Sequence, residues 1–391
     1  MSELSLESWS RRRFLRHLSQ SVGALALVNA IPAIGRAVEI AHDHSSLIVR
    51  LSRPQDLETP MEYLDSSITP NPVFFVRSHF GPPAITKEKW RLELGGLVDS
   101  PRDLIFDDLR KFEIVSLPAT LQCSGNGRAF FHPTVPGVQW HRGAVGNALW
   151  RGVRLRDVLK SIGIKSAARH LQMRGYDSAP MPTTPSFTRS IPLERALDPS
   201  TLLAFEMNGE PLPLLHGGPL RLVVPGWAGD HWYKWLRRID LQENEADGFY
   251  KQTAYRMPRP THSSNAAASA PEIPVTVNPV KSLIAHPSEG SVIPPGDHLV
   301  SGVAFTGVGH VIKVEVSLDG GRSWKRAELE GKQSEGAWQL WRYRWKVSAK
   351  GTYAIAARAT DSSGRVQLEV TRWNHGGYLW NGIDQVHCEI A

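Results

Sequence analysis

A change of composition at residues 257–275 divides the chain and limits the folds open to it. This stretch reads Met-Pro-Arg-Pro-Thr-His-Ser-Ser-Asn-Ala-Ala-Ala-Ser-Ala-Pro-Glu-Ile-Pro-Val, and proline, serine and alanine dominate it, as is typical of a linker. The chain has 391 residues, which is long enough for a separate hydrophobic core on each side of the linker. We therefore expect one domain over residues 38–256 and a second over residues 276–391.

The first domain mixes helical and strand patterns. Residues 107–112 and 155–162 place apolar side chains three and four positions apart, which predicts short helices. Residues 221–225 read Arg-Leu-Val-Val-Pro, which predicts a buried strand ended by proline. Such alternation without an internal repeat predicts an α+β domain with mixed sheets.

The second domain shows the two-residue alternation of β-strands. Apolar and polar side chains alternate along residues 311–318 and again along residues 341–347. The sequence Asp-Gly-Gly at 319–321 predicts a hairpin turn after the first of these strands. Several such strands at short spacing predict an immunoglobulin-like β-sandwich, which we expect to support or dimerise the first domain.

The N-terminus has the pattern of an export signal. Residues 10–15 read Ser-Arg-Arg-Arg-Phe-Leu, a twin-arginine motif, and the apolar stretch at 18–34 follows it. Polar residues interrupt that stretch, so it is weak as a permanent membrane span, and no later segment is long and apolar enough for one. We expect a signal over residues 1–37 that exports the folded protein to the periplasm. The alternative is a basic helix that happens to begin with paired arginines.

The net charge argues against a nucleic-acid partner. It is +7 over the chain, and the arginines of the signal account for part of this excess. The remainder is a mild positive charge without a long basic run, which suits small anions better than nucleic acid.

Cys123 stands in the segment most indicative of chemistry. Residues 119–128 read Ala-Thr-Leu-Gln-Cys-Ser-Gly-Asn-Gly-Arg, so an apolar run leads the cysteine into a glycine-rich loop. Glycines allow close approach of a bulky group, and Arg128 favours a thiolate, the ligand that a soft metal prefers. Taken alone, a single cysteine is more often a small buried apolar residue. The only other cysteine, Cys388, allows a disulfide with Cys123 but no zinc motif, and we assign it no role.

The cysteine loop resembles that of the sulfite oxidase family, in which the cysteine binds molybdenum. The likeness extends over nearly all of the chain after the signal. Further matching segments are 74–79 (Phe-Phe-Val-Arg-Ser-His), 140–159, 203–212, 216–226, 234–236, 316–324 and 373–374. So many matches in one order imply a mixed α/β molybdopterin-binding domain followed by the sandwich.

The resemblance implies a role for each matching residue. Cys123 is expected to bind molybdenum that is held by one pyranopterin dithiolene (molybdopterin). The residues expected to bind the pterin and its phosphate are His79, His216, Arg221 and Lys234, with Asp177 as a less secure member. The residues expected to form the substrate pocket are Arg77, Arg128, Trp140 and Tyr255. On its own residue type, Trp140 is open to a second interpretation as a core aromatic.

The resemblance also implies an activity, the oxidation of sulfite to sulfate. Because the chain lacks the Cys-x-x-Cys-His haem motif, we expect no haem in it and expect an external periplasmic c-type cytochrome to accept the electrons. Oxidation of sulfane sulfur and reduction of a sulfoxide on the same cofactor are the enzymatic alternatives. A periplasmic scaffold or binding protein is the alternative without catalysis.

Two positions depart from the pattern of the animal and plant enzymes. Ala254 stands before the tyrosine where those enzymes have aspartate. The closing Trp-Asn-His-Gly-Gly at 373–377 lacks the arginine of their Trp-Asn-x-Arg-Gly. Both departures indicate a bacterial branch, so an arginine from the second domain cannot be assumed in the substrate pocket.

Overall fold

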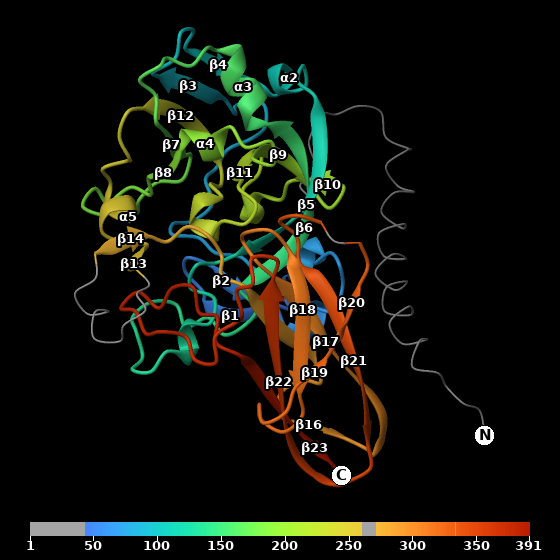
Figure 1. The fold of residues 1–391 in the computed structure, drawn as a ribbon. Coiled ribbons are helices and arrows are strands. Elements are labelled where there is room, and N and C mark those ends of the chain that lie inside the picture. The colour runs from blue at the N-terminus through green and yellow to red at the C-terminus, as the bar shows by residue number, and fades with distance from the viewer. Residues whose placement is uncertain (1–43, 260–270, 333) are drawn as a thin grey trace. The chain divides into compact units, whose positions relative to one another are not determined.

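The computed structural model describes residues 44–259, 271–332 and 334–391, which fall within one compact unit (Figure 1). The export signal predicted over residues 1–37 lies outside the described residues, as does the middle of the predicted linker. Over the described ranges, no helix has the length and apolar character needed to cross a membrane.

The N-terminal domain contains two five-stranded sheets (Figure 1). The first is antiparallel and consists of β10 (Glu210–Pro211), β9 (Leu202–Met207), β6 (Val145–Arg154) and β5 (Ile114–Gln122), with β11 (Arg221–Val223) also paired to β9. The second is mixed and has the order β4 (Arg102–Leu104), β3 (Leu92–Gly96), β12 (Leu236–Gln242), β7 (His170–Gly175) and β8 (Arg189–Pro192). Within this second sheet, β3 and β12 pair in parallel and the other neighbouring strands pair antiparallel.

One hydrophobic core joins these two sheets. Trp150 and Leu222 from the first sheet and Leu92 and Ile239 from the second all lie in it, each at most 1% exposed. The helices around it are short: α2 (Phe106–Leu109), α3 (Leu155–Ser161), α4 (Leu193–Ala196) and α5 (Phe249–Gln252). The two predicted helices are thus confirmed as α2 and α3, although α2 ends at Leu109 and a turn follows it.

Short elements complete this domain. They are the antiparallel pair β1 (Ile48–Leu51) and β2 (Asp56–Glu58), and the 3-10 turns η2 (Met61–Tyr63), η3 (Asn71–Val73), η4 (Arg128–Phe130), η5 (Leu214–His216) and η6 (Gly229–His231). Two of these turns, η5 and η6, carry residues that line the cavity described below.

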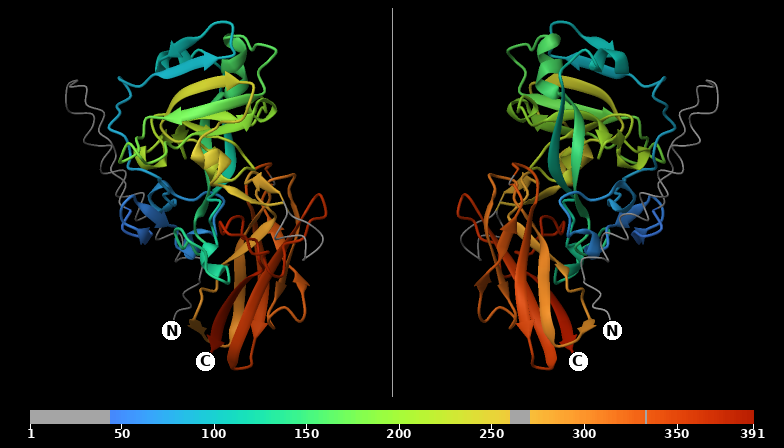
Figure 2. Two further views of the ribbon diagram at one scale, coloured as in Figure 1. Left: turned by 90° about the vertical axis from the view of Figure 1, so that its left-hand side faces the viewer. Right: turned by 90° about the vertical axis from the view of Figure 1, so that its right-hand side faces the viewer.

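The C-terminal domain consists of two sheets around a second core (Figure 2). One has the order β15 (Lys281–His286), β17 (Gly296–Phe305), β21 (Gln339–Val347) and β20 (Glu328–Glu330). The other has the order β16 (Ser291–Ile293), β23 (Asp384–Ile390), β22 (Gly351–Asp361), β18 (Val311–Ser317) and β19 (Lys325–Arg326).

The alternation read in the sequence accounts for this core. Trp341 and Trp345 from one sheet are buried together with Val314 and Val316 from the other. The predicted tight turn is part of a longer loop between Ser317 and Lys325. An α+β domain followed by a β-rich domain is therefore confirmed, while the immunoglobulin-like topology stays a prediction.

The two domains pack closely where the cysteine loop begins. The ends of the linker pair as β13 (Arg256–Pro258) and β14 (Glu272–Pro274). Hydrogen bonds then connect β5 to the C-terminal domain. In one of them, the Gln122 side chain donates to Asn278 Oδ1 at 3.1 Å. The Thr120 backbone N–H donates to the Gly336 carbonyl at 2.8 Å. The end of β5, which carries the chain into Cys123, thus lies against the C-terminal domain.

Candidate active site

Buried amides fix the loop that holds Cys123. The Cys123 N–H donates to the Ala144 carbonyl at 2.9 Å. Asn126 accepts from the Ala144 N–H at 3.1 Å and donates to Gln122 Oε1 at 3.2 Å. Gly127 has a φ of 91°, and a Cβ there would lie 2.6 Å from the Trp380 ring, so glycine is required at this position. Both cysteines are free thiols.

A cavity with an interior of about 80 Å³ opens beside Cys123. Eight of the ten residues predicted from the sequence line it: Arg77, His79, Cys123, Asp177, His216, Arg221, Lys234 and Tyr255. The fold therefore brings to one place residues that are spread over most of the N-terminal domain.

The other two predicted residues do not line this cavity. Arg128 Nε donates to the Gly376 carbonyl at 3.1 Å, and its Nη1 donates to the Val138 carbonyl at 3.2 Å. Trp140 is fully buried in the core, with its ring centroid 6.4 Å from that of Phe75. The substrate roles of both residues stay predictions, and the position of Trp140 fits its second interpretation as a core aromatic.

One end of the cavity holds two cationic side chains, Arg221, which is buried, and Lys234, which is half-buried. Arg221 donates to the carbonyls of His216 and Trp232 at 2.7 and 2.9 Å, and its Nε has no hydrogen-bond partner. Lys234 Nζ donates to Ser78 Oγ at 2.8 Å and to the Leu215 carbonyl at 3.1 Å. No carboxylate of the described chain forms an ion pair with either cation.

Burial shifts the pKa values of this cationic group. It lowers the pKa of Arg221 to about 9 and holds the pKa values of Lys234 and His216 well below their usual ranges. Buried cations without a counter-charge are costly, and a phosphate with several acceptor oxygens would satisfy them. This end of the cavity therefore fits the phosphate of a pterin cofactor.

The cysteine alone does not make a metal site. Among the residues with a described position, no group of three or more His, Cys, Asp and Glu side chains is placed to hold a metal ion. A metal at Cys123 would therefore bring its other ligands with it, as a dithiolene does.

The protonation of Cys123 differs from the expectation based on Arg128. Burial raises the pKa of the Cys123 thiol, although Arg77, the Gly125 N–H and Arg128 act to lower it. Desolvation outweighs these charges, so the thiol is favoured in the protein alone and metal binding must displace its proton.

Arg77 and Tyr255 lie in the same cavity as Cys123. Arg77 forms an ion pair with buried Asp56 at 3.2 Å and keeps a quarter of its side chain exposed. The Tyr255 hydroxyl lies 2.7 Å from His79 Nε2, and its ring stacks on Tyr378 from the C-terminal domain. Burial raises the pKa of Tyr255 and holds that of His79 well below its usual range, so the contact is a hydrogen bond between a neutral phenol and a neutral imidazole.

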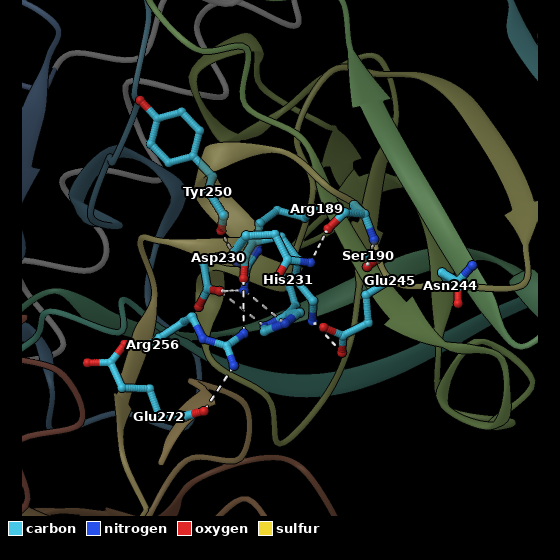
Figure 3. A network of polar contacts seen from close by, with 12 residues as sticks. Arg189, Ser190, Asp230, His231, Asn244, Glu245, Tyr250, Arg256 and Glu272 are labelled. Atoms are coloured by element: carbon cyan, nitrogen blue, oxygen red, sulfur yellow. Dashed lines mark hydrogen bonds and ion pairs between the residues drawn. The ribbon is translucent and has the colours of Figure 1, made fainter. Parts of the chain in front are cut away.

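Sequence reasoning missed a buried ion pair at the cavity wall. Arg189 and Asp230 are in contact with side chains that are 0% and 1% exposed, and Asp230 lines the cavity (Figure 3). The Arg189 guanidinium carbon also lies 5.1 Å from the centre of the Tyr255 ring. The signal available in the sequence was a charged Gly-Asp-His at 229–231 within an otherwise apolar segment.

Two family models match the chain. The oxidoreductase molybdopterin binding domain matches residues 79–250, and the Mo-co oxidoreductase dimerisation domain matches residues 273–390.

Curated relatives match most of the chain. Mitochondrial sulfite oxidase of Rattus norvegicus is 37% identical over 369 residues, covering 89% of this chain and 66% of the relative. The chain thus spans just under two thirds of that relative. Sulfite oxidase of Arabidopsis thaliana is 34% identical over 361 residues, covering 86% of this chain and 92% of the relative.

A solved structure also matches along nearly the whole length. Sulfane dehydrogenase SoxCD from Paracoccus pantotrophus has a TM-score of 0.77 and 29% identity, with 92% of this chain and 95% of that chain covered.

Proposed function

The chain belongs to the sulfite oxidase family of molybdopterin oxidoreductases, and from this premise we propose that it oxidises sulfite to sulfate. The observation that carries the proposal is a single cavity that joins one cysteine thiol to a partly exposed arginine and to buried cations. Its cations suit a small oxyanion as well as a cofactor phosphate.

The cavity residues divide into two sets around the cofactor. Cys123 would bind the metal, and Arg221, Lys234 and His216 would hold the pterin and its phosphate, with Asp177 beside them. The molybdenum centre, when bound, supplies the two-electron oxidation and the oxygen transfer to sulfur. The protein supplies position and charge.

Arg77 is the residue we assign to the oxyanion. Its ion pair with Asp56 fixes the guanidinium, and its exposed quarter faces the cavity. Tyr255 is 2.7 Å from His79 Nε2, and when that nitrogen carries the proton and donates to the phenol, the Tyr255 O–H is left to donate to the same anion.

Electrons and protons must both leave the site. One sulfite and one water give one sulfate, two electrons and two protons. We propose that an external c-type cytochrome accepts the electrons one at a time, that the enzyme works in the periplasm, and that the C-terminal domain forms a homodimer. The family model for residues 273–390 supports the dimer.

A sulfane-sulfur dehydrogenase is the second candidate. The likeness to the SoxCD structure favours it, and so does the position of Arg128, which leaves Arg77 as the only arginine predicted for substrate that lines the cavity in the described part of the chain. A less cationic pocket suits a larger, less charged substrate.

The test is sulfite-dependent reduction of cytochrome c by the purified holoenzyme, with molybdenum determined on the same sample. Stoichiometric metal with rapid reduction supports sulfite oxidation. Stoichiometric metal with reduction only by a persulfide-bearing peptide supports the second candidate. Folded protein that lacks molybdenum, although it was expressed in cells that synthesise the cofactor, would contradict both candidate functions.

A further inference from the structure

Asp230 is a buried carboxylate whose two oxygens have different surroundings. It lies on η6 in the cavity wall, and its Oδ2 contacts Arg189 and lies 3.3 Å from His231 Nδ1 (Figure 3). Its Oδ1 is buried and has no hydrogen-bond partner. A buried acceptor without a partner is costly, so the free oxygen needs a function or a ligand.

The proposed reaction provides such a function. Each turnover consumes one water and releases two protons, so the cavity needs a group that accepts a proton. The neutral imidazoles of His79 and His216 are weak bases because burial holds their pKa values well below the usual range. The Tyr255 phenol is already in contact with His79.

The other cavity carboxylate is less suited to this task. Asp177 belongs to the set predicted to contact the pterin, and Lys234 acts on it electrostatically. Asp56 lies behind the cavity, and its Oδ1 accepts from Arg77 and from the Ser78 N–H, both at 3.2 Å. Asp230 is thus the cavity carboxylate that lies outside the predicted pterin set and has a buried oxygen without a partner.

We propose that Asp230 accepts a proton from the water consumed in each turnover, with Arg189 as its positioning residue. The inference rests on the proposed function. The water O–H bond breaks with its electron pair left on oxygen, and the proton passes to Oδ1 and then to solvent. The second O–H bond breaks in the same way, the water oxygen replaces the one that leaves in sulfate, and two oxidised cytochromes take the two electrons. Oδ2 stays bound to Arg189, so the carboxylate keeps its orientation while Oδ1 gains and loses the proton.

The charges around Asp230 suit this role. Arg189 on β8 and Lys251 on α5 stabilise the charged carboxylate, and its charge acts on the hydroxyls of Tyr255 and Tyr378. Burial is the largest effect and raises the pKa of Asp230 to about 6. A base with a pKa near neutrality both accepts and releases protons readily.

Asp230→Asn in the holoenzyme tests the proposal. We expect the sulfite kcat to fall about 100-fold with little change in KM, and added formate to restore part of the rate. Asp384→Asn is the matched control, because Asp384 is also a buried carboxylate paired with an arginine, Arg142 at 3.4 Å, and lies outside this cavity. Its pH profile should match that of the unchanged protein. Unaltered kcat and pH profile in Asp230→Asn would overturn the proposal.

A purely structural ion pair predicts a different result. If Asp230 serves only to neutralise Arg189, the double variant Asp230→Asn, Arg189→Met should regain activity without formate. If Asp230 is the proton acceptor, the double variant stays slow.

An infrared titration provides a readout that does not depend on turnover. The protonated-carboxyl band that appears near pH 6 should be missing in Asp230→Asn, and its persistence would count against the assignment. Absence of sulfite activity in the unchanged holoenzyme would instead reject the proposed function while leaving this titration intact.

Discussion

At the residue scale, Cys123 is half-buried and presents a free thiol to the cavity. Burial raises the pKa of its thiol, so the protein does not stabilise a free thiolate there. Arg221 and Lys234, which fit the pterin phosphate, line the same cavity and are held by backbone carbonyls and Ser78, not by the sulfur. A substitution at Cys123 should therefore remove the metal ligand without releasing the pterin.

Cys123→Ala should abolish sulfite oxidation while the protein still retains pterin. The thiolate ligand is lost, but Arg221 and Lys234 remain to hold the phosphate. The measurement is turnover together with pterin fluorescence after denaturation and molybdenum content. Cys388→Ala is the control, because Cys388 is buried in the C-terminal core, and it should keep full specific activity. Normal turnover in Cys123→Ala would refute the ligand assignment.

The two arginines predicted for the substrate should behave differently. Arg77 lines the cavity, so Arg77→Gln should raise the sulfite KM about 10- to 100-fold, as expected for loss of a charge-assisted hydrogen bond. Arg128 donates to the carbonyls of Gly376 and Val138, so Arg128→Gln should mainly lower stability. Steady-state kinetics and thermal unfolding of both variants decide this, and equal KM increases would place Arg128 in the pocket.

Motifs in the sequence indicated many of the residues that line the cavity, but the motif residues Arg128 and Trp140 do not line it. Eight predicted residues line one cavity because their segments match the family in order. Asp230 and Arg189 were missed because neither belongs to a matching motif. The direction of Arg128 depends on Gly376 and Tyr378, which approach it only through packing of the C-terminal domain. Contacts of that kind are not encoded in local spacing.

At the element scale, the domains are joined by a close backbone crossing. Gly226, just after β11, has a φ of 81°, and a Cβ on it would lie 2.5 Å from the Gly307 carbonyl oxygen. A Cβ on Gly307 would lie 2.3 Å from the Gly226 carbonyl oxygen. Both glycines are thus needed for the two domains to approach each other here. The linker composition predicted a boundary, but this contact depends on three-dimensional packing.

Gly226→Ala should destabilise the protein by more than its backbone angle alone explains. Gly209 is the matched control, because its φ is 82° and a Cβ there would meet nothing within 4 Å. Gly209→Ala should cost about 1 kcal/mol of unfolding free energy from the left-handed backbone. Gly226→Ala should cost at least about 2–3 kcal/mol, because the clash adds to the same strain. Urea unfolding measures both, and equal losses would contradict the close crossing.

The regular elements followed from periodicity more directly than the irregular ones. Alternation predicted β18 and β21, and the buried residues Val314, Val316, Trp341 and Trp345 confirm which face packs inward. The helix at α3 followed from apolar residues three and four apart. The 3-10 turns that carry His216 and Asp230 were not predicted, because three-residue turns have no periodicity to detect.

At the scale of the whole molecule, a buried lysine lies between the domains. Lys281 on β15 is 0% exposed, donates to Gln122 Oε1 at 3.2 Å and lies over the Trp380 ring at 4.8 Å. Burial lowers its pKa to about 7, and the nearby Asp384 and Glu58 oppose this shift. Between pH 7 and the usual lysine pKa, the unfolded chain binds this proton and the folded chain does not. The contribution of Lys281 to the free energy of unfolding therefore rises with pH in that window. Below pH 7 the amino group is charged in the folded protein, and the full cost of burying that charge is present.

Lys281→Met should stabilise the protein at pH 6.5 by about 1–4 kcal/mol, since a well-packed apolar side chain replaces a desolvated charge. The gain should shrink toward pH 9, where the lysine is mostly neutral in the folded state. Urea unfolding at the two pH values provides the comparison, with exposed Lys350→Met as the control. A loss of stability at pH 6.5 would show that the charge is needed.

The cationic end of the cavity makes the cofactor part of the fold's energetics. Neither Arg221, which is buried, nor Lys234, which is half-buried, forms an ion pair with a carboxylate in the described structure. An anion that binds there therefore stabilises the folded state by mass action. The cofactor-free protein should therefore unfold at a lower temperature than the holoenzyme, and millimolar inorganic phosphate should raise its midpoint. Chloride at equal ionic strength should not, and neither should phosphate with Arg221→Met. A phosphate effect of the same size in the holoenzyme would place the anion elsewhere, because there the cofactor already fills this site.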